Sequence, residues 1–147
     1  MRGRLPVETS REMDEVCRET GNRQMIDLAA QEAGKHGDLD LSAALFERAL
    51  EIDPEAVKTR LGLLTTLHLQ SRFEDEIPLI KALLEIIPNE PTLHRFAIQA
   101  GKWGGDMDLA RRGLELVRQH DPRAAEAATR FLNADIPPPR RMPRAPQ

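Results

Sequence analysis

The chain of 147 residues has little of several residue types that define common protein classes. It contains one cysteine, Cys17, no tyrosine, and only 3% aromatic residues. A single cysteine cannot form an internal disulfide, which fits a reducing compartment. No apolar run approaches the roughly 20 residues that span a bilayer, and the first residues lack the apolar core of a signal peptide. We therefore predict a cytoplasmic protein with no membrane partner.

An excess of positive charge is also lacking. The chain has 21 Lys and Arg against 24 Asp and Glu, a net charge of −3. The last thirteen residues hold three Arg and one Asp, which leaves 18 basic and 23 acidic residues in the remainder. A nucleic-acid binder needs a basic face that neutralises phosphates. The composition therefore predicts no nucleic-acid partner.

Residues 37–54, GDLDLSAALFERALEIDP, have the pattern of a turn followed by an amphipathic helix. Gly37 permits a positive φ, and Asp38 offers an N-cap oxygen. Apolar and small residues then recur at helical spacing, which leaves one face to bury. Pro54 suits the first turn of a second helix, because the N–H that it lacks would have no partner there.

The same pattern returns at a fixed interval, because Pro54, Pro88 and Pro122 lie 34 residues apart. This repeat register gives copies at residues 23–56, 57–90 and 91–124, with a further helix at residues 122–133. It predicts helices near residues 23–36, 39–52, 55–70, 74–86, 91–103 and 107–119. It also places Phe46 at a position that is buried between one copy and the next.

The 34-residue period and the proline register resemble those of the tetratricopeptide repeat, a helix–turn–helix unit that stacks on copies of itself. The second copy fits less well, because Glu76 stands where the family has a small residue and Pro78 lies early in a helix. A non-repeating helical bundle with coincident prolines is the alternative. The resemblance implies an all-α fold, a right-handed α-solenoid of three repeats at residues 23–134, in which residues 122–133 form a capping helix.

The segments outside the repeats are expected to differ from them. Residues 1–22 form an N-terminal extension with a short helix that ends at Gly21, interpreted as a lid over the first repeat. The alternative is a homodimer formed through the segment from Thr9 to Thr20. Residues 135–147, DIPPPRRMPRAPQ, contain five prolines and are expected to be polyproline-II or disordered. Pro143 and Pro146 have the spacing of an SH3-type ligand, but a solvated tail is favoured.

The sequence offers no constellation for catalysis, metal binding or a cofactor. Its histidines lack metal-ligand spacing; they are His36, His68, His94 and His120. Cys17 has no His in its own helix to activate it. The Gly104-Gly105 pair follows no expected strand and precedes no GK[ST], so it is not a phosphate loop. We therefore predict a protein that is not an enzyme.

The resemblance implies that the first helix of each repeat lines a concave groove in which ligands bind. The family's groove positions carry over to Gln24, Asp27, Gln31, Lys35, Lys58, Leu61, Thr65, His68, Leu69, Thr92, Arg95, Gln99, Lys102 and Trp103. Four bases face one acid at these positions, in a chain that is acidic overall. This inversion predicts a site for an acidic or carboxylate-ended peptide, and a solvated wall is the alternative. The predicted partner-binding residues are Lys35, Lys58, Leu61, Thr65, His68, Arg95, Gln99, Lys102 and Trp103. For Trp103 the alternative is packing on the capping helix.

One function of the family is argued against by the residues. Repeat proteins that bind heat-shock-protein tails clamp a terminal carboxylate with a set of Lys, Asn and Arg. The matching positions here hold Asp27, Gln31, Gly62, Thr92 and Phe96. We therefore expect an adaptor or scaffold that binds a peptide or partner protein. The alternatives are a client-holding chaperone similar to three-repeat secretion chaperones, and a regulatory partner of an enzyme.

Overall fold

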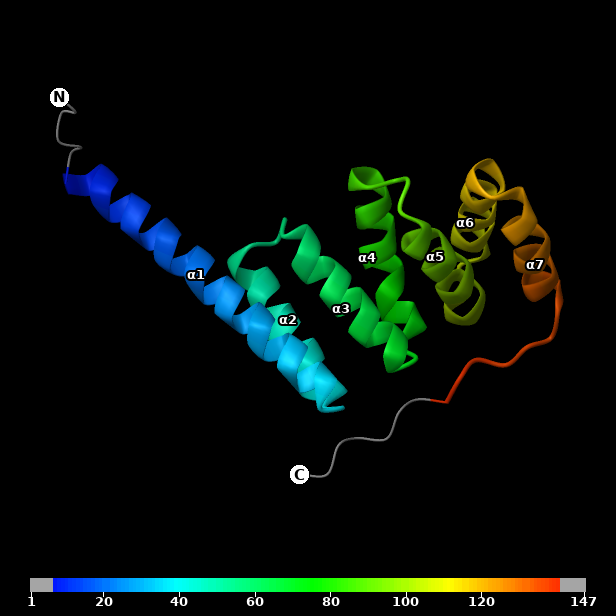
Figure 1. The fold of residues 1–147 in the computed structure, drawn as a ribbon, viewed down its shortest axis with the longest axis horizontal. Coiled ribbons are helices and arrows are strands. Elements are labelled where there is room, and N and C mark those ends of the chain that lie inside the picture. The colour runs from blue at the N-terminus through cyan, green and yellow to red at the C-terminus, as the bar shows by residue number, and fades with distance from the viewer. Residues whose placement is uncertain (1–6, 141–147) are drawn as a thin grey trace. The chain divides into compact units, whose positions relative to one another are not determined.

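The structure is a computed structural model that describes residues 7–140, with side chains from residue 21 onward. This part of the chain is all-helical, with seven consecutive helices and no strand (Figure 1). They are α1 (Val7–Lys35), α2 (Leu39–Ile52), α3 (Val57–Leu69), α4 (Phe73–Ile86), α5 (Pro91–Gly104), α6 (Met107–His120) and α7 (Pro122–Asn133). The predicted fold class, an all-α solenoid of helix–turn–helix repeats, is confirmed.

The helices divide into two units, and the boundary falls between residues 62 and 63, within α3. In the first unit, α1 packs along α2. In the second unit, α4 packs against α5, α5 against α6, and α6 against α7. The helices from α2 to α7 begin and end within about two residues of the positions that the repeat register predicts, a difference no larger than the usual uncertainty of helix ends.

The turn inside each repeat uses a left-handed residue at one position of the register. Gly37 and Gly105 have φ values of 80° and 87°, and Ser71, 34 residues from each, has a φ of 57°. Glycine adopts this conformation freely, whereas a residue with a Cβ is strained there. The second repeat therefore carries strain at a turn where the other two carry none.

The residue after this turn caps the next helix in two of the three repeats. The carboxylates of Asp38 and Asp106 accept a hydrogen bond from a backbone N–H in the first turns of α2 and α6. Arg72 occupies the same position before α4 and makes no side-chain cap. Pro78 lies within α4 without shifting its start, because Phe73 begins α4 at the same register position as Leu39 begins α2. The second repeat thus lacks both local devices that start this helix in its neighbours.

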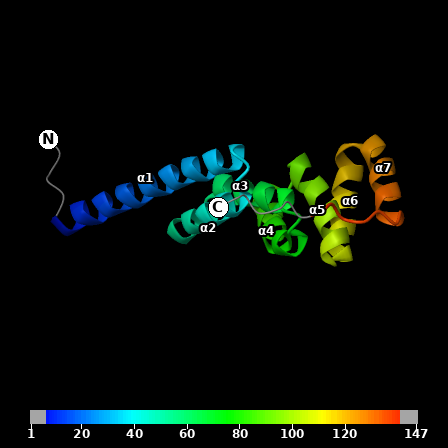
Figure 2. The same ribbon diagram turned by 90° about the horizontal axis from the view of Figure 1, so that it is seen from below.

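The predicted helix end at Gly21 is wrong, because α1 runs without a break from Val7 to Lys35. Gly21 has no positive φ, and a Cβ added to it would meet nothing within 4 Å. A glycine inside a helix costs about 1 kcal/mol relative to alanine, which a long helix tolerates. Figures 1 and 2 both show the first part of α1 extending beyond α2. The predicted dimerisation segment from Thr9 to Thr20 therefore belongs to α1, but its side chains lie outside the described residues, as does Cys17.

Phe46 is buried, as the sequence predicts, with 4% of its surface exposed. Its ring packs against Gly62 of α3, where an added Cβ would lie 2.5 Å from the ring. Gly62 has no side chain, and the space that this leaves is filled by the Phe46 ring. This contact joins the second helix of the first repeat to the first helix of the second.

Candidate functional site

A groove of about 550 Å³ lies between α5 and α7, with α6 behind it. It is lined by Pro91, His94, Arg95, Ile98, Gln99, Val117, His120, Asp121, Ala124, Ala127, Ala128 and Phe131. We call it the α5–α7 groove. It exists because α7 packs on α6 and touches α5 only sparsely.

Small and aliphatic side chains make the walls of the α5–α7 groove. Ala124 and Ala128 are one helical turn apart on α7, so their short side chains leave room beside α5. Ile98 is buried and contributes to the apolar lining from α5. The groove can therefore take an apolar side chain of a ligand.

Polar groups stand at the rim of the same groove. Arg95 is exposed, and its guanidinium lies 5.9 Å from the centre of the Phe96 ring. No ion pair of Arg95 occurs among the described residues, so its charge is available to a ligand. Gln99 lies one turn further along α5 and is half-buried. Two of the predicted partner-binding residues are thus brought together here.

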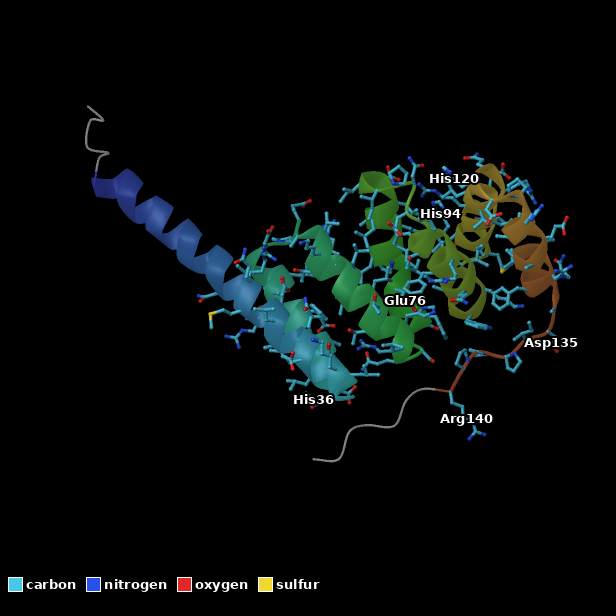
Figure 3. All side chains as sticks on the ribbon, viewed as in Figure 1. His36, Glu76, His94, His120, Asp135 and Arg140 are labelled. Carbon is cyan, nitrogen blue, oxygen red and sulfur yellow. The ribbon has the colours of Figure 1, made fainter. Side chains whose placement is uncertain are left out.

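Two histidines stack at one end of the α5–α7 groove (Figure 3). The rings of His94 and His120 are 5.5 Å apart and nearly parallel. His94 is buried, and its Nε2 lies 2.6 Å from the Pro88 carbonyl oxygen. Because a carbonyl oxygen only accepts, Nε2 of His94 donates this bond. His94 is thereby fixed in place, whereas His120 is exposed at the rim.

His68, a predicted partner-binding residue, forms an internal pair with Glu76. Its Nδ1 lies 2.8 Å from Oε1 of Glu76, whose side chain is fully buried. Burial raises the pKa of the Glu76 carboxyl above its ordinary value, and the hydrogen bond and charge of His68 offset part of that rise. The His68 ring also stacks on Phe96, with centroids 4.0 Å apart. His68 therefore serves packing within the second unit.

The repeat register explains why this pair exists. Gly34 and Ser42 occupy the corresponding positions in the first repeat, and a Cβ on Gly34 would lie 3.4 Å from the Ser42 hydroxyl. Both positions hold large polar residues in the second repeat, and those residues bond to each other. Sequence reasoning noticed Glu76 alone; the signal it missed is that His68 departs from the small residue of the first repeat at the facing position.

Lys102 and Trp103, also predicted to bind a partner, hold the end of α7 and the segment after it. The Lys102 ammonium donates to the carbonyls of Phe131 and Ala134 and lies 4.6 Å from the centre of the Phe131 ring. The Trp103 indole N–H donates to the Ile136 carbonyl at 3.0 Å. The structure therefore gives both residues partners inside the chain.

The remaining predicted residues do not line the α5–α7 groove. Lys35, Lys58 and Leu61 belong to the first unit, where Lys35 is exposed and pairs with Glu32 at 3.4 Å. Thr65 is exposed on α3 in the second unit.

Asp27 of the first unit, the one acid among the family's groove positions, is also engaged inside the chain. It pairs with Arg23 at 2.7 Å and accepts a hydrogen bond from the buried Thr59 hydroxyl at 2.9 Å.

Comparisons with known proteins agree with an all-α helical-repeat class. A family model described as tetratricopeptide repeat matches residues 28–91. The protein CTR9 homolog of Arabidopsis thaliana is 29% identical over 92 residues, which cover 62% of this chain and 8% of that protein. No solved structure matches. Residues 28–91 therefore match the tetratricopeptide repeat, and such repeats are protein-interaction units that are typically non-catalytic.

Within the described part of the chain, no helix combines the length and apolar character needed to cross a membrane. Among the same residues, no three His, Cys, Asp or Glu side chains are placed to hold a metal ion. The α5–α7 groove is the candidate functional site.

Proposed function

We propose that this chain is an adaptor that binds a segment of a partner protein in the α5–α7 groove. The observation that carries this proposal is a groove of about 550 Å³ with apolar walls from three helices and an exposed arginine at its rim. Binding sites are commonly concave, mostly apolar, and fitted with a few polar groups that fix orientation.

The residues of the groove define the chemistry of the partner segment. An apolar side chain would fill the space beside Ala124 and Ala128, and its burial would supply most of the affinity. An acidic residue or a terminal carboxylate would pair with Arg95. Because Arg95 is exposed, this pair would contribute mainly to the association rate and to salt dependence.

The test begins with capture of the partner from the native cell by the full chain and its identification by mass spectrometry. Ala124→Trp fills the groove from an exposed position of α7 and should abolish capture. Ala44→Trp is the matched control, because Ala44 is also an exposed helical alanine but lies on α2. Circular dichroism should show both variants folded. Capture by Ala124→Trp at the wild-type level would exclude the groove as the site.

A client-holding chaperone is the second candidate, because two large apolar side chains are exposed on α1. Met25 and Leu28 have 70% and 62% of their surfaces exposed. Exposed methionine is common on surfaces that bind many partners. The double substitution Met25→Gln with Leu28→Gln should remove protection of an unfolded client against aggregation if this candidate is right. A chain that gives no such protection before substitution would favour the adaptor.

A further inference from the structure

The segment after α7 is extended and returns along the second unit. Ala134, which follows α7, has φ −86° and ψ 150°, values close to those of polyproline-II. Residues 135–140 then read DIPPPR and carry no regular secondary structure. Figure 3 labels the first and last of these residues, Asp135 and Arg140. Two backbone carbonyls of the segment accept hydrogen bonds from side chains of the helical part.

The first of these bonds comes from Trp103, whose indole N–H donates to the Ile136 carbonyl at 3.0 Å. The second comes from Ser71, whose hydroxyl donates to the Arg140 carbonyl at 3.4 Å. Between them, Pro138 and Pro139 lie against a hollow of about 350 Å³. The helical part contributes to it Ser71, Arg72, Phe73, Glu74, Asp75 and Trp103, which we call the Trp103 surface.

The Trp103 surface is built from rigid aromatic rings. The rings of Phe73 and Trp103 are 5.0 Å apart, and Phe131 meets the indole edge-on at 5.1 Å. Phe73 is buried, so the indole rests on the core of the second unit. The indole N–H consequently points from a fixed ring toward the segment that covers it.

We propose that the Trp103 surface is a binding site for an extended proline-rich segment, and that residues 135–140 of the same chain occupy it in cis. A polyproline-II segment has no internal hydrogen bonds, so its carbonyls are free to accept from a donor such as the Trp103 indole. Proline-rich segments dock on aromatic-lined surfaces because little conformational entropy remains to be lost. The site goes beyond the α5–α7 groove, with which it shares no lining residue.

Charge and exposure fit the same occupant. Glu74 is exposed and lines the Trp103 surface, so it favours a basic residue next to the prolines, such as Arg140. Pro138 and Pro139 line the hollow and remain exposed, so the segment can leave without unfolding the helices. A tethered segment has an effective concentration in the millimolar range, so a proline-rich segment of another protein binds only by displacing it.

The test uses the single tryptophan of the chain, which gives one indole N–H signal in a nitrogen-resolved NMR spectrum. The full chain carrying Pro137→Ser, Pro138→Ser and Pro139→Ser should show this signal displaced from its wild-type position. Addition of the peptide ADIPPPR, residues 134–140 of the chain, should return it toward that position. The control peptide ADIAAAR should not. The wild-type chain should bind ADIPPPR at least tenfold more weakly than the triple variant, because its own segment competes.

A second variant isolates the hydrogen bond. In the triple variant, Trp103→Phe keeps a ring and removes the N–H, and it should weaken binding of fluorescent ADIPPPR by roughly three- to tenfold. An indole signal that is the same in the wild-type chain and the triple variant would overturn the proposal. Equal binding of the two peptides would also overturn it. A wild-type signal that moves with protein concentration would show that the segment of a second copy, rather than the chain's own, occupies the surface.

Discussion

Nδ1 of His68 lies within hydrogen-bond distance of Oε1 of Glu76, at 2.8 Å, at positions where the first repeat holds glycine and serine. The other oxygen of Glu76 is buried without a hydrogen-bond partner among the described residues. His68 retains 19% of its side-chain surface exposed, whereas Glu76 retains none. Without His68, the buried carboxylate of Glu76 would have neither a partner nor water. Without Glu76, the His68 ring would still be reached by water.

Removal of the two partners should have opposite effects on stability. His68→Ala leaves a buried, uncompensated carboxylate and should lower the free energy of unfolding by about 3 kcal/mol. Glu76→Ala leaves a histidine that water can reach, and it restores the small residue that Ala110 provides in the third repeat, so it should raise this free energy by about 1 kcal/mol. Urea unfolding of both variants measures the difference, and equal losses would contradict the argument that the buried carboxylate of Glu76 depends on His68.

The pH dependence of stability should also report on Glu76. Burial raises the folded-state pKa of Glu76 above its ordinary value of 4.5, so its contribution to stability is fully present below about pH 4.5. That contribution is lost as the pH rises through the raised pKa. The stability of Glu76→Gln relative to the wild type should therefore increase between pH 4.5 and 7.5. Glu74→Gln, an exposed substitution in the same helix turn, is the control and should show no such trend. A difference that stays constant with pH for Glu76→Gln would contradict the prediction.

One substitution in the strained turn of the second repeat should stabilise the chain. Ser71→Gly removes the cost of a Cβ at positive φ and should stabilise the chain by about 1 kcal/mol. Gly105→Ser should destabilise it by a similar amount, because it places a Cβ at positive φ. An added Cβ meets no atom within 4 Å there, so the substitution tests the backbone conformation alone. The midpoints of urea unfolding give both values, and changes of the same sign would contradict the argument.

Phe46 and Gly62 should behave as a coupled pair. Phe46→Ala should cost about 3–5 kcal/mol, as for other large core residues. Gly62→Ala should cost about 1–3 kcal/mol, although alanine is the better helix former, because its Cβ would meet the Phe46 ring. In a Phe46→Leu background the cost of Gly62→Ala should fall. A double-mutant cycle without coupling would show that the ring does not rest on the glycine.

Binding at the α5–α7 groove should depend on the charge of Arg95. Arg95→Glu should weaken capture of the partner and flatten the salt dependence of its affinity, because attraction across the rim is replaced by repulsion. Lys102→Glu is not equivalent, since Lys102 holds the carbonyls at the end of α7 and its loss should lower stability as well. Wild-type affinity and salt dependence in the Arg95 variant would argue against an acidic partner segment at this rim.

The repeat period predicts those parts of the molecule that depend on local pattern. The proline register and the apolar spacing were sufficient for α2 to α7, and for the burial of Phe46, because helix ends and buried faces recur every 34 residues. The α5–α7 groove was found only in part, through Arg95 and Gln99. The volume of the groove depends on the distance between α5 and α7, and the repeat period does not determine that distance.

The 34-residue period could not predict contacts that occur in one repeat only. The carry-over of family positions assigned Lys102 and Trp103 to the concave groove, but both donate hydrogen bonds to carbonyls after α7, in a segment that has no counterpart in the repeat. The predicted helix end at Gly21 was wrong for a related reason. Gly21 lowers helix propensity locally, but residues on both sides continue the helix, and the cost of one glycine is small beside that of starting a second helix.

The unbroken course of α1 has a consequence for the segment that precedes the first repeat. Starting a helix is the unfavourable step, whereas each added residue extends an existing helix at little cost. The packed half of α1, beside α2, can act as the nucleus from which residues 7–20 propagate. Residues 7–20 are then helical because the first repeat is folded. On heating, this segment should unfold first, from residue 7 inward, and the first repeat should unfold after it.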